Sequence, residues 1–141
     1  MMYTTGLLEL QLGNAQVVTS TGDKIKYGCS LEPFTVRAFA LTITTAITTN
    51  ALVLTLENRP TAGSDTGRTV VATLNLAVAS AFNAAGKSIY IHGLNQKVLP
   101  GGELVVKVGG TAPAAGNVNV GLLVEPYTET PSNNANMSLT T

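Results

Sequence analysis

The chain of 141 residues has the length of one domain, and its 45% hydrophobic content excludes global disorder. No apolar run approaches the roughly 20 residues of a membrane-spanning helix, so we expect no membrane partner. Only 11% of the residues are charged, eight basic and eight acidic, against about 25% in a typical soluble domain, and without a Lys/Arg cluster we expect no nucleic-acid partner.

Apolar residues that alternate with polar ones predict half-buried β-strands along the N-terminal part of the chain. The first alternating run, 8–12, is followed by a short run at 16–19 and by a third at 24–29. Gly13-Asn14 is a turn signal between the first two runs, because Gly and Asn tolerate the backbone angles of tight turns. We therefore expect three short strands before residue 30.

The next run, 34–43, changes phase, because its apolar residues before Arg37 and after Ala38 fall on opposite sides of a regular strand. A β-bulge near Arg37–Ala38 restores a single apolar side, so we predict one there. Five further alternating runs predict five more strands: 52–57, 70–76, 89–92, 104–108 and 118–124.

One segment, Ala77–Ala85, is rich in alanine and predicts a short helix that Gly86 ends as a C-terminal cap. Long amphipathic helices, which a parallel α/β architecture needs, are absent from the pattern. About eight strands with this one short helix predict an all-β fold, an antiparallel β-sandwich.

The ends of the chain differ from the alternating centre. We expect a short N-terminal arm over 1–6, a sandwich domain over 7–127 and an extended C-terminal arm over 128–141, where Pro, Asn and Ser dominate. The N-terminus has no basic region followed by an apolar stretch, so the sequence predicts no signal peptide.

The sequence offers little that catalysis needs. His92 is the only histidine, and its alternation with Ile91 places it on the outer side of a strand beside Tyr90. Asp65-Thr66-Gly67 matches the short signature of aspartic proteases, but it follows a polar loop instead of an apolar strand and indicates a turn. We therefore expect that the protein is not an enzyme.

The sequence also predicts no cofactor and no metal site. Its acidic residues are dispersed along the chain, and none of its loops resembles a calcium-binding loop. Cys29 is the only cysteine, so it forms no intramolecular disulfide and no Cys-based zinc site, and we expect it to be a small buried hydrophobe.

Outward positions of the predicted strands are mostly polar without charge. Thr suits strands, and its hydroxyl hydrates without a charge, so these positions predict flat, charge-poor surfaces available for docking. The polar outward residues are Thr42, Thr44, Thr55, Thr73, Asn75, Asn117 and Asn119. Four apolar residues are predicted to join them on the outer surfaces: Val53, Val71, Val105 and Leu123.

The last third of the chain consists of 98–108, with its Pro100-Gly101-Gly102 element, a small-residue loop, 118–126 and the Pro/Asn-rich arm. In these features it resembles the small cement, or decoration, proteins of tailed bacteriophages. It implies a jelly-roll sandwich, self-association into a homodimer or homotrimer, and attachment to the outer surface of the capsid. Such a protein is made in the host cytoplasm and ends on the virion.

On this hypothesis the partners are the major capsid protein and further copies of the chain, and the protein cements contacts between capsid subunits. Multivalent attachment makes modest contacts collectively strong, and an extended arm can add a strand to a neighbour's sheet edge. We expect the arm to contact the capsid through Asn133, Asn134, Asn136, Met137 and Leu139.

Two alternatives remain open at the level of sequence. The first is a receptor- or carbohydrate-binding β-sandwich, such as a spike or fibre head, although the chain has no Trp and only 5% aromatic residues. The second is a hydrolase built on a sandwich, for which Asp65 or His92 would have to be essential.

Overall fold

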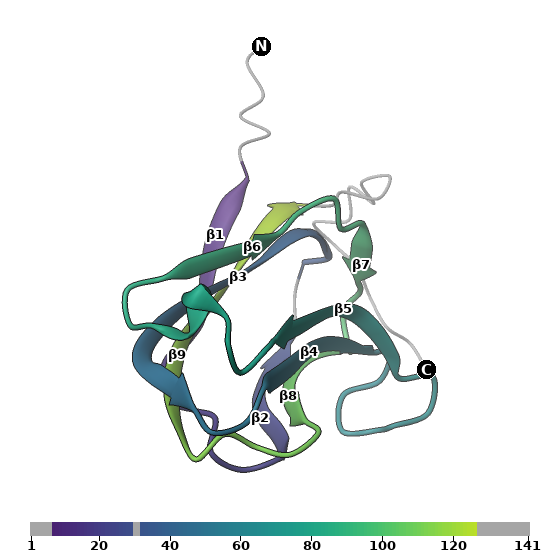
Figure 1. Cartoon of the computed structure of the whole chain (residues 1–141). Helices are drawn as coiled ribbons and strands as arrows, with labels where there is room; N and C mark the ends of the chain where they lie inside the picture. The colour runs from purple at the N-terminus through teal and green to yellow at the C-terminus, as the bar shows by residue number, and fades with distance from the viewer. Residues whose placement is uncertain (1–6, 30–31, 127–141) are drawn as a thin grey trace, which may run out of the picture.

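The computed structural model describes residues 7–29 and 32–126, which form two antiparallel β-sheets packed face to face (Figure 1). Among these described residues, helical structure is confined to one 3-10 turn, η1 (Ala81–Asn83). The strands are β1 (Leu8–Val17), β2 (Gly22–Gly28), β3 (Phe34–Thr48), β4 (Leu52–Arg59), β5 (Thr69–Leu76), β6 (Ser88–Ile91), β7 (Gln96–Val98), β8 (Glu103–Gly109) and β9 (Ala115–Pro126). The all-β sandwich predicted from the sequence is therefore confirmed.

The strand order is that of a jelly roll. Sheet A has the order β1-β9-β3-β6, with β7 also paired to β3, and sheet B has the order β2-β8-β4-β5. The chain is thus folded in half, with β1 beside β9, β2 beside β8, β3 beside β6 and β7, and β4 beside β5. This doubled chain winds around the core. Its successive strand pairs therefore belong alternately to sheet A and sheet B, as in a double-sheet jelly roll.

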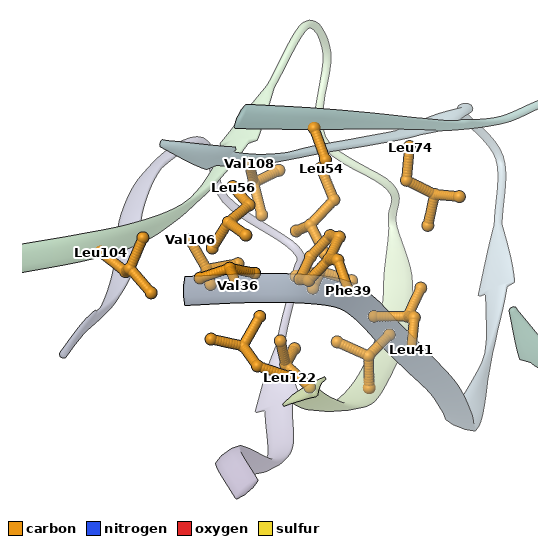
Figure 2. Packing of buried hydrophobic residues seen from close by; sticks show 14 of the residues in the cluster. Val36, Phe39, Leu41, Leu54, Leu56, Leu74, Leu104, Val106, Val108 and Leu122 are labelled. Atoms are coloured by element: carbon orange, nitrogen blue, oxygen red, sulfur yellow. The ribbon is translucent and has the colours of Figure 1, made fainter. Parts of the chain in front are cut away.

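The hydrophobic core lies between the sheets and follows from the period-two alternation (Figure 2). In sheet A, Leu10, Leu122, Phe39 and Ile91 form one inward row, since each is paired with the next across neighbouring strands. Sheet B faces them with the inward side chains of its own strands: Leu54, Leu56, Leu74, Leu104, Val106 and Val108.

The bulge predicted near Arg37–Ala38 is confirmed. The register between β3 and β9 shifts between Val36 and Ala38. The extra residue lets Val36 and Phe39 both face the core, although their separation would place them on opposite sides of a regular strand.

Two strand predictions need correction. The predicted strands 8–12 and 16–19 are parts of one strand, β1, and the expected turn at Gly13-Asn14 is an irregularity within it, where the register with β9 shifts twice. The short strand β7 was not predicted, because three residues are too few to show an alternation.

The predicted helix over Ala77–Ala85 is wrong, since only the single turn η1 forms. Ser80 caps this turn by accepting a hydrogen bond from the backbone N–H of Phe82. The Asn83 side chain donates to the carbonyl oxygens of Ala77 and Val78, at 2.9 and 2.8 Å. Side chains that bond nearby backbone groups compete with helix formation, so alanine content alone does not decide the conformation.

Candidate functional site

The residues predicted to contact a capsid, Asn133 to Leu139, lie outside the described residues, as do both predicted arms, 1–6 and 128–141. The candidate sites within the described residues are therefore the outward surfaces of the two sheets. Each is built by the residues that alternate with the core.

The outward surface of sheet A, here named the A face, consists of cross-strand rows. In its central row Gln11, Gly121, Ala40 and Tyr90 lie opposite one another on β1, β9, β3 and β6. The rows on either side contribute Glu9, Leu123, Ala38, Thr42, Asn119 and Ser88. Residues that are paired across an antiparallel sheet point to the same side, so these ten residues share one surface.

The residues of the A face are uncharged except for Glu9 on the edge strand β1, and most have short side chains. Ala38 and Gly121 are buried by their neighbours even though they face outward, so the middle of the surface is flat. Polar groups on it are largely satisfied internally, because the hydroxyl groups of Thr42 and Ser88 bond at 2.9 Å and the Asn119 side chain accepts from the Ala15 N–H at 2.7 Å. Covering this surface would desolvate few unpaired polar groups.

At the β6 edge, the A face carries an exposed aromatic pair. The Tyr90 side chain is 54% exposed, and its ring stacks on the imidazole of His92 with centroids 5.6 Å apart and an interplanar angle of 13°. The predicted position of His92, outward and beside Tyr90, is confirmed.

A cluster of charged residues lies on the outward surface of sheet B, and the sequence analysis did not predict it. Two arginines and four of the eight acidic residues form what we name the arginine cluster: Arg59, Arg68, Asp23, Glu57, Asp65 and Glu103. These residues come from β2, β4, β8 and the loop between β4 and β5. The acids are dispersed along the chain but lie together in space.

Arg59 is the centre of the cluster, and its side chain is only 6% exposed. Its Nη1 lies 2.7 Å from Glu103 Oε1, and its Nη2 lies 2.8 Å from Asp65 Oδ1 and 3.1 Å from Asp23 Oδ2. One guanidinium thus joins β4 to β8, to β2 and to the following loop. This use of several fixed donors is characteristic of arginine and not of lysine.

Arg68 closes the cluster from the loop that precedes β5. Its Nε lies 2.6 Å from Glu57 Oε1, its Nη2 lies 2.7 Å from Asp23 Oδ1, and its Nη1 lies 2.9 Å from Asp65 Oδ1. The Gly63 N–H donates to Glu103 Oε1 at 2.9 Å, which fastens the middle of the same loop.

Asp65-Thr66-Gly67, the protease-like triplet, is part of this loop. Its backbone turns so that the Arg68 N–H bonds the Asp65 carbonyl oxygen at 3.1 Å, with Gly67 at a φ of +74°. The turn predicted there is confirmed, and the Asp65 carboxylate serves as an acceptor for two arginines.

The cluster holds its members in their charged forms. The Arg68 guanidinium lowers the pKa of Asp23 and of Asp65, and the Gly63 N–H together with Arg59 lowers the pKa of Glu103. The carboxylates in turn raise the pKa of both arginines. The third arginine of the chain, Arg37, is also paired, with its Nε 2.8 Å from Glu125 Oε2 at one end of sheet A.

The apolar residues predicted to face outward differ in burial and in orientation. Val53 and Leu123 are half-buried at outward positions. Val105 faces outward between Lys26 and Glu57 but is fully buried. Val71 packs against the core, so its predicted orientation is wrong; a register shift between β4 and β5 changes the phase at that point.

Other features of the described residues bear on chemistry. Cys29 is buried, as predicted. Across residues 7–29 and 32–126, no three or more His, Cys, Asp or Glu side chains are arranged to hold a metal ion. Within the same residues no helix is long and apolar enough to cross a membrane.

Comparison with known proteins yields no match, either to a protein-family model or to a curated protein. Function must therefore be argued from the jelly-roll fold and from the two outward surfaces.

The lowered pKa values predict an acid-sensitive fold. A carboxyl group whose pKa is lower in the folded than in the unfolded state stabilises the fold above its ordinary pKa, here 3.8 for the aspartates and 4.5 for Glu103, and loses that stabilisation as the pH falls through the folded value. We expect the melting temperature to be level above about pH 5 and to fall steadily below about pH 4.5. Thermal unfolding followed by circular dichroism across this range measures it.

Two variants separate the cluster from a general acid effect. Glu103→Gln should lower the melting temperature at pH 7 and make the fall in acid shallower, because one of the coupled carboxylates is gone. Glu9→Gln removes an exposed carboxylate outside the cluster and should change neither. Equal acid profiles for Glu103→Gln and the unmodified chain would contradict the assignment.

Proposed function

We propose that this protein is a structural virion component that binds the outer surface of a tailed-phage capsid and cements contacts between major capsid protein subunits. The observation that carries the proposal is the A face, which is flat and, on the central strands β3 and β9, uncharged. The jelly roll is used for viral capsid domains, and the centres of protein interfaces are depleted in charge. A binding role of this kind needs no catalytic residue and no cofactor.

The arginine cluster supports the proposal indirectly. All three arginines of the chain pair with carboxylates of the same fold, so a partner would not have to desolvate an unpaired guanidinium.

Attachment at several points would complete the mechanism. Copies of the chain associate, each lays its A face on the shell, and the C-terminal arm reaches neighbouring capsid subunits through Asn133 to Leu139. Each contact can be modest, because linked contacts raise one another's effective concentration. The jelly roll acts as a rigid block between them.

A lysine in the centre of the A face tests the docking surface. Ala40→Lys introduces a charge that capsid binding would have to desolvate without a partner, so we expect affinity for the shell to fall at least about tenfold. Co-sedimentation with shells that lack this protein, from the phage whose genome encodes it, measures binding. The matched control is Ala114→Lys in the exposed loop between β8 and β9, which should bind normally. Equal binding by Ala40→Lys and the control would exclude the A face as the contact.

A truncation tests the arm separately. Deleting the residues after Tyr127 leaves the strands and the core intact, so the melting temperature should change little, while shell binding weakens because contacts per copy are lost. The same co-sedimentation assay measures it. If the truncated chain binds shells as tightly as the full chain, the arm has no part in attachment.

The Tyr90–His92 pair favours a second candidate, a receptor- or carbohydrate-binding sandwich. An exposed aromatic ring offers an apolar platform beside polar groups, as sugar recognition requires. A glycan-array screen with the unmodified chain and Tyr90→Ala distinguishes the candidates. Binding that is lost in Tyr90→Ala supports glycan recognition, and an array without binding leaves the capsid proposal as the better one.

A further inference from the structure

The edges of the two sheets are the places where another chain could add a strand. Sheet A ends in β1 on one side and in β6 and β7 on the other, and sheet B ends in β2 and β5. An edge strand presents unpaired backbone N–H and C=O groups, and proteins protect such edges with charges, irregularities or short strands.

Every edge but β5 carries such protection. In β1 the register shifts on both sides of Gly13, β2 carries Asp23, Lys24 and Lys26, and β6 and β7 are only four and three residues long. These features oppose regular pairing with a strand of another molecule.

The β5 strand is different. It is eight residues long, and no charged residue or proline occurs between Thr69 and Gly86. Its one register shift lies near its start, so Ala72 to Leu76 are regular. Among the described residues, its backbone pairs only with β4, so the other side of the strand is free.

Exposed apolar side chains flank this edge at both ends. Val70 at the start of β5 is 58% exposed, and Val78 and Phe82 after its end are 57% and 50% exposed. The loop that carries Val78 and Phe82 is held in shape by the hydrogen bonds of Asn83 and Ser80. The loop therefore presents two large apolar side chains to the solvent in a fixed position, and contact with another chain would bury them.

We infer that β5 pairs antiparallel with the β5 strand of a second copy across a two-fold axis. In such a pair the end of one strand lies beside the start of the other, so Val78 and Phe82 of each copy approach the equivalent of Val70 in the other. Apolar side chains of the two copies thus meet at both ends of the strand pair, and no charged residue lies opposite its equivalent in the other copy. A two-fold interface must be self-complementary, and this edge satisfies that condition.

The direction of the side chains limits the register of the pair. Inward residues must lie opposite inward residues, so a residue must lie on the axis, and pairing through the regular segment from Ala72 to Leu76 places Thr73 or Leu74 there. With Leu74 there, Thr73 lies opposite Asn75 of the second copy, and Val70 lies opposite Val78. The two sheets B then join into one sheet of eight strands.

This inference specifies the self-association that the proposed function includes, but it does not require capsid binding. It is tested on the purified protein alone, so its failure leaves the capsid assays untouched, and failure of those assays leaves it standing.

The first test is mass in solution across a wide concentration range, by sedimentation velocity. We expect a dimer, and we expect Thr73→Lys to raise its dissociation constant at least about tenfold, because a charge on an exposed edge position must face the other copy. Thr44→Lys makes the same change at an exposed position of β3 and should leave the dimer intact. A monomer at all concentrations, or a Thr73→Lys dimer as tight as the unmodified one, overturns the inference.

The second test does not depend on a destabilising change. The variant carrying Thr73→Cys and Asn75→Cys should form a disulfide-linked dimer on mild oxidation in either register, since opposed strand residues lie close enough for a disulfide. The native Cys29 is buried, so Thr44→Cys reports any background linkage. A linked dimer confined to the β5 variant supports the pairing. Linkage no greater than that of Thr44→Cys overturns it.

Discussion

The pairing of β3 with β9 is the interaction on which the rest of the structure depends. These are the two longest strands, and they lie side by side in the middle of sheet A. Their inward side chains, among them Phe39 and Leu122, supply the centre of the core. The same register fixes their outward residues, so Ala38, Ala40 and Gly121 are brought together as the middle of the A face by the same pairing that builds the core.

Charged residues are distributed unevenly in the fold, because a group of them forms the arginine cluster on sheet B. Burying an ion pair costs desolvation that its own attraction repays only with good geometry and further hydrogen bonds. The arginine cluster meets that condition, since Arg59 and Arg68 share carboxylates and the Gly63 N–H adds a further donor. The cluster fixes the position of the loop between β4 and β5. It therefore also fixes the position of the start of β5, whose edge is uncharged.

Alternation along the sequence predicted most strands of the two sheets and also the bulge at Arg37–Ala38. Strands and bulge could be predicted because each depends on residues close in sequence. The prediction of a helix over Ala77–Ala85 was wrong because the side chain of Asn83 competes for backbone carbonyl groups. Composition does not reveal this competition. The arginine cluster could not be predicted for another reason. Asp23 and Glu103 reach Arg59 only through the order β2-β8-β4, which no local pattern encodes, and the predicted strand 52–57 ended before Arg59.

The two proposed contacts use different parts of the jelly roll, and this has a geometric consequence. The β5 edge belongs to sheet B, whereas the A face is the outward surface of sheet A. When two β5 strands pair with inward residues opposite inward residues, both copies of sheet A lie on the same side of the joined sheet B. The two A faces then point in the same direction, and one dimer can lay both on one shell. The proposed edge contact would thereby turn a weak single attachment into a bivalent one, without any change in the A face itself.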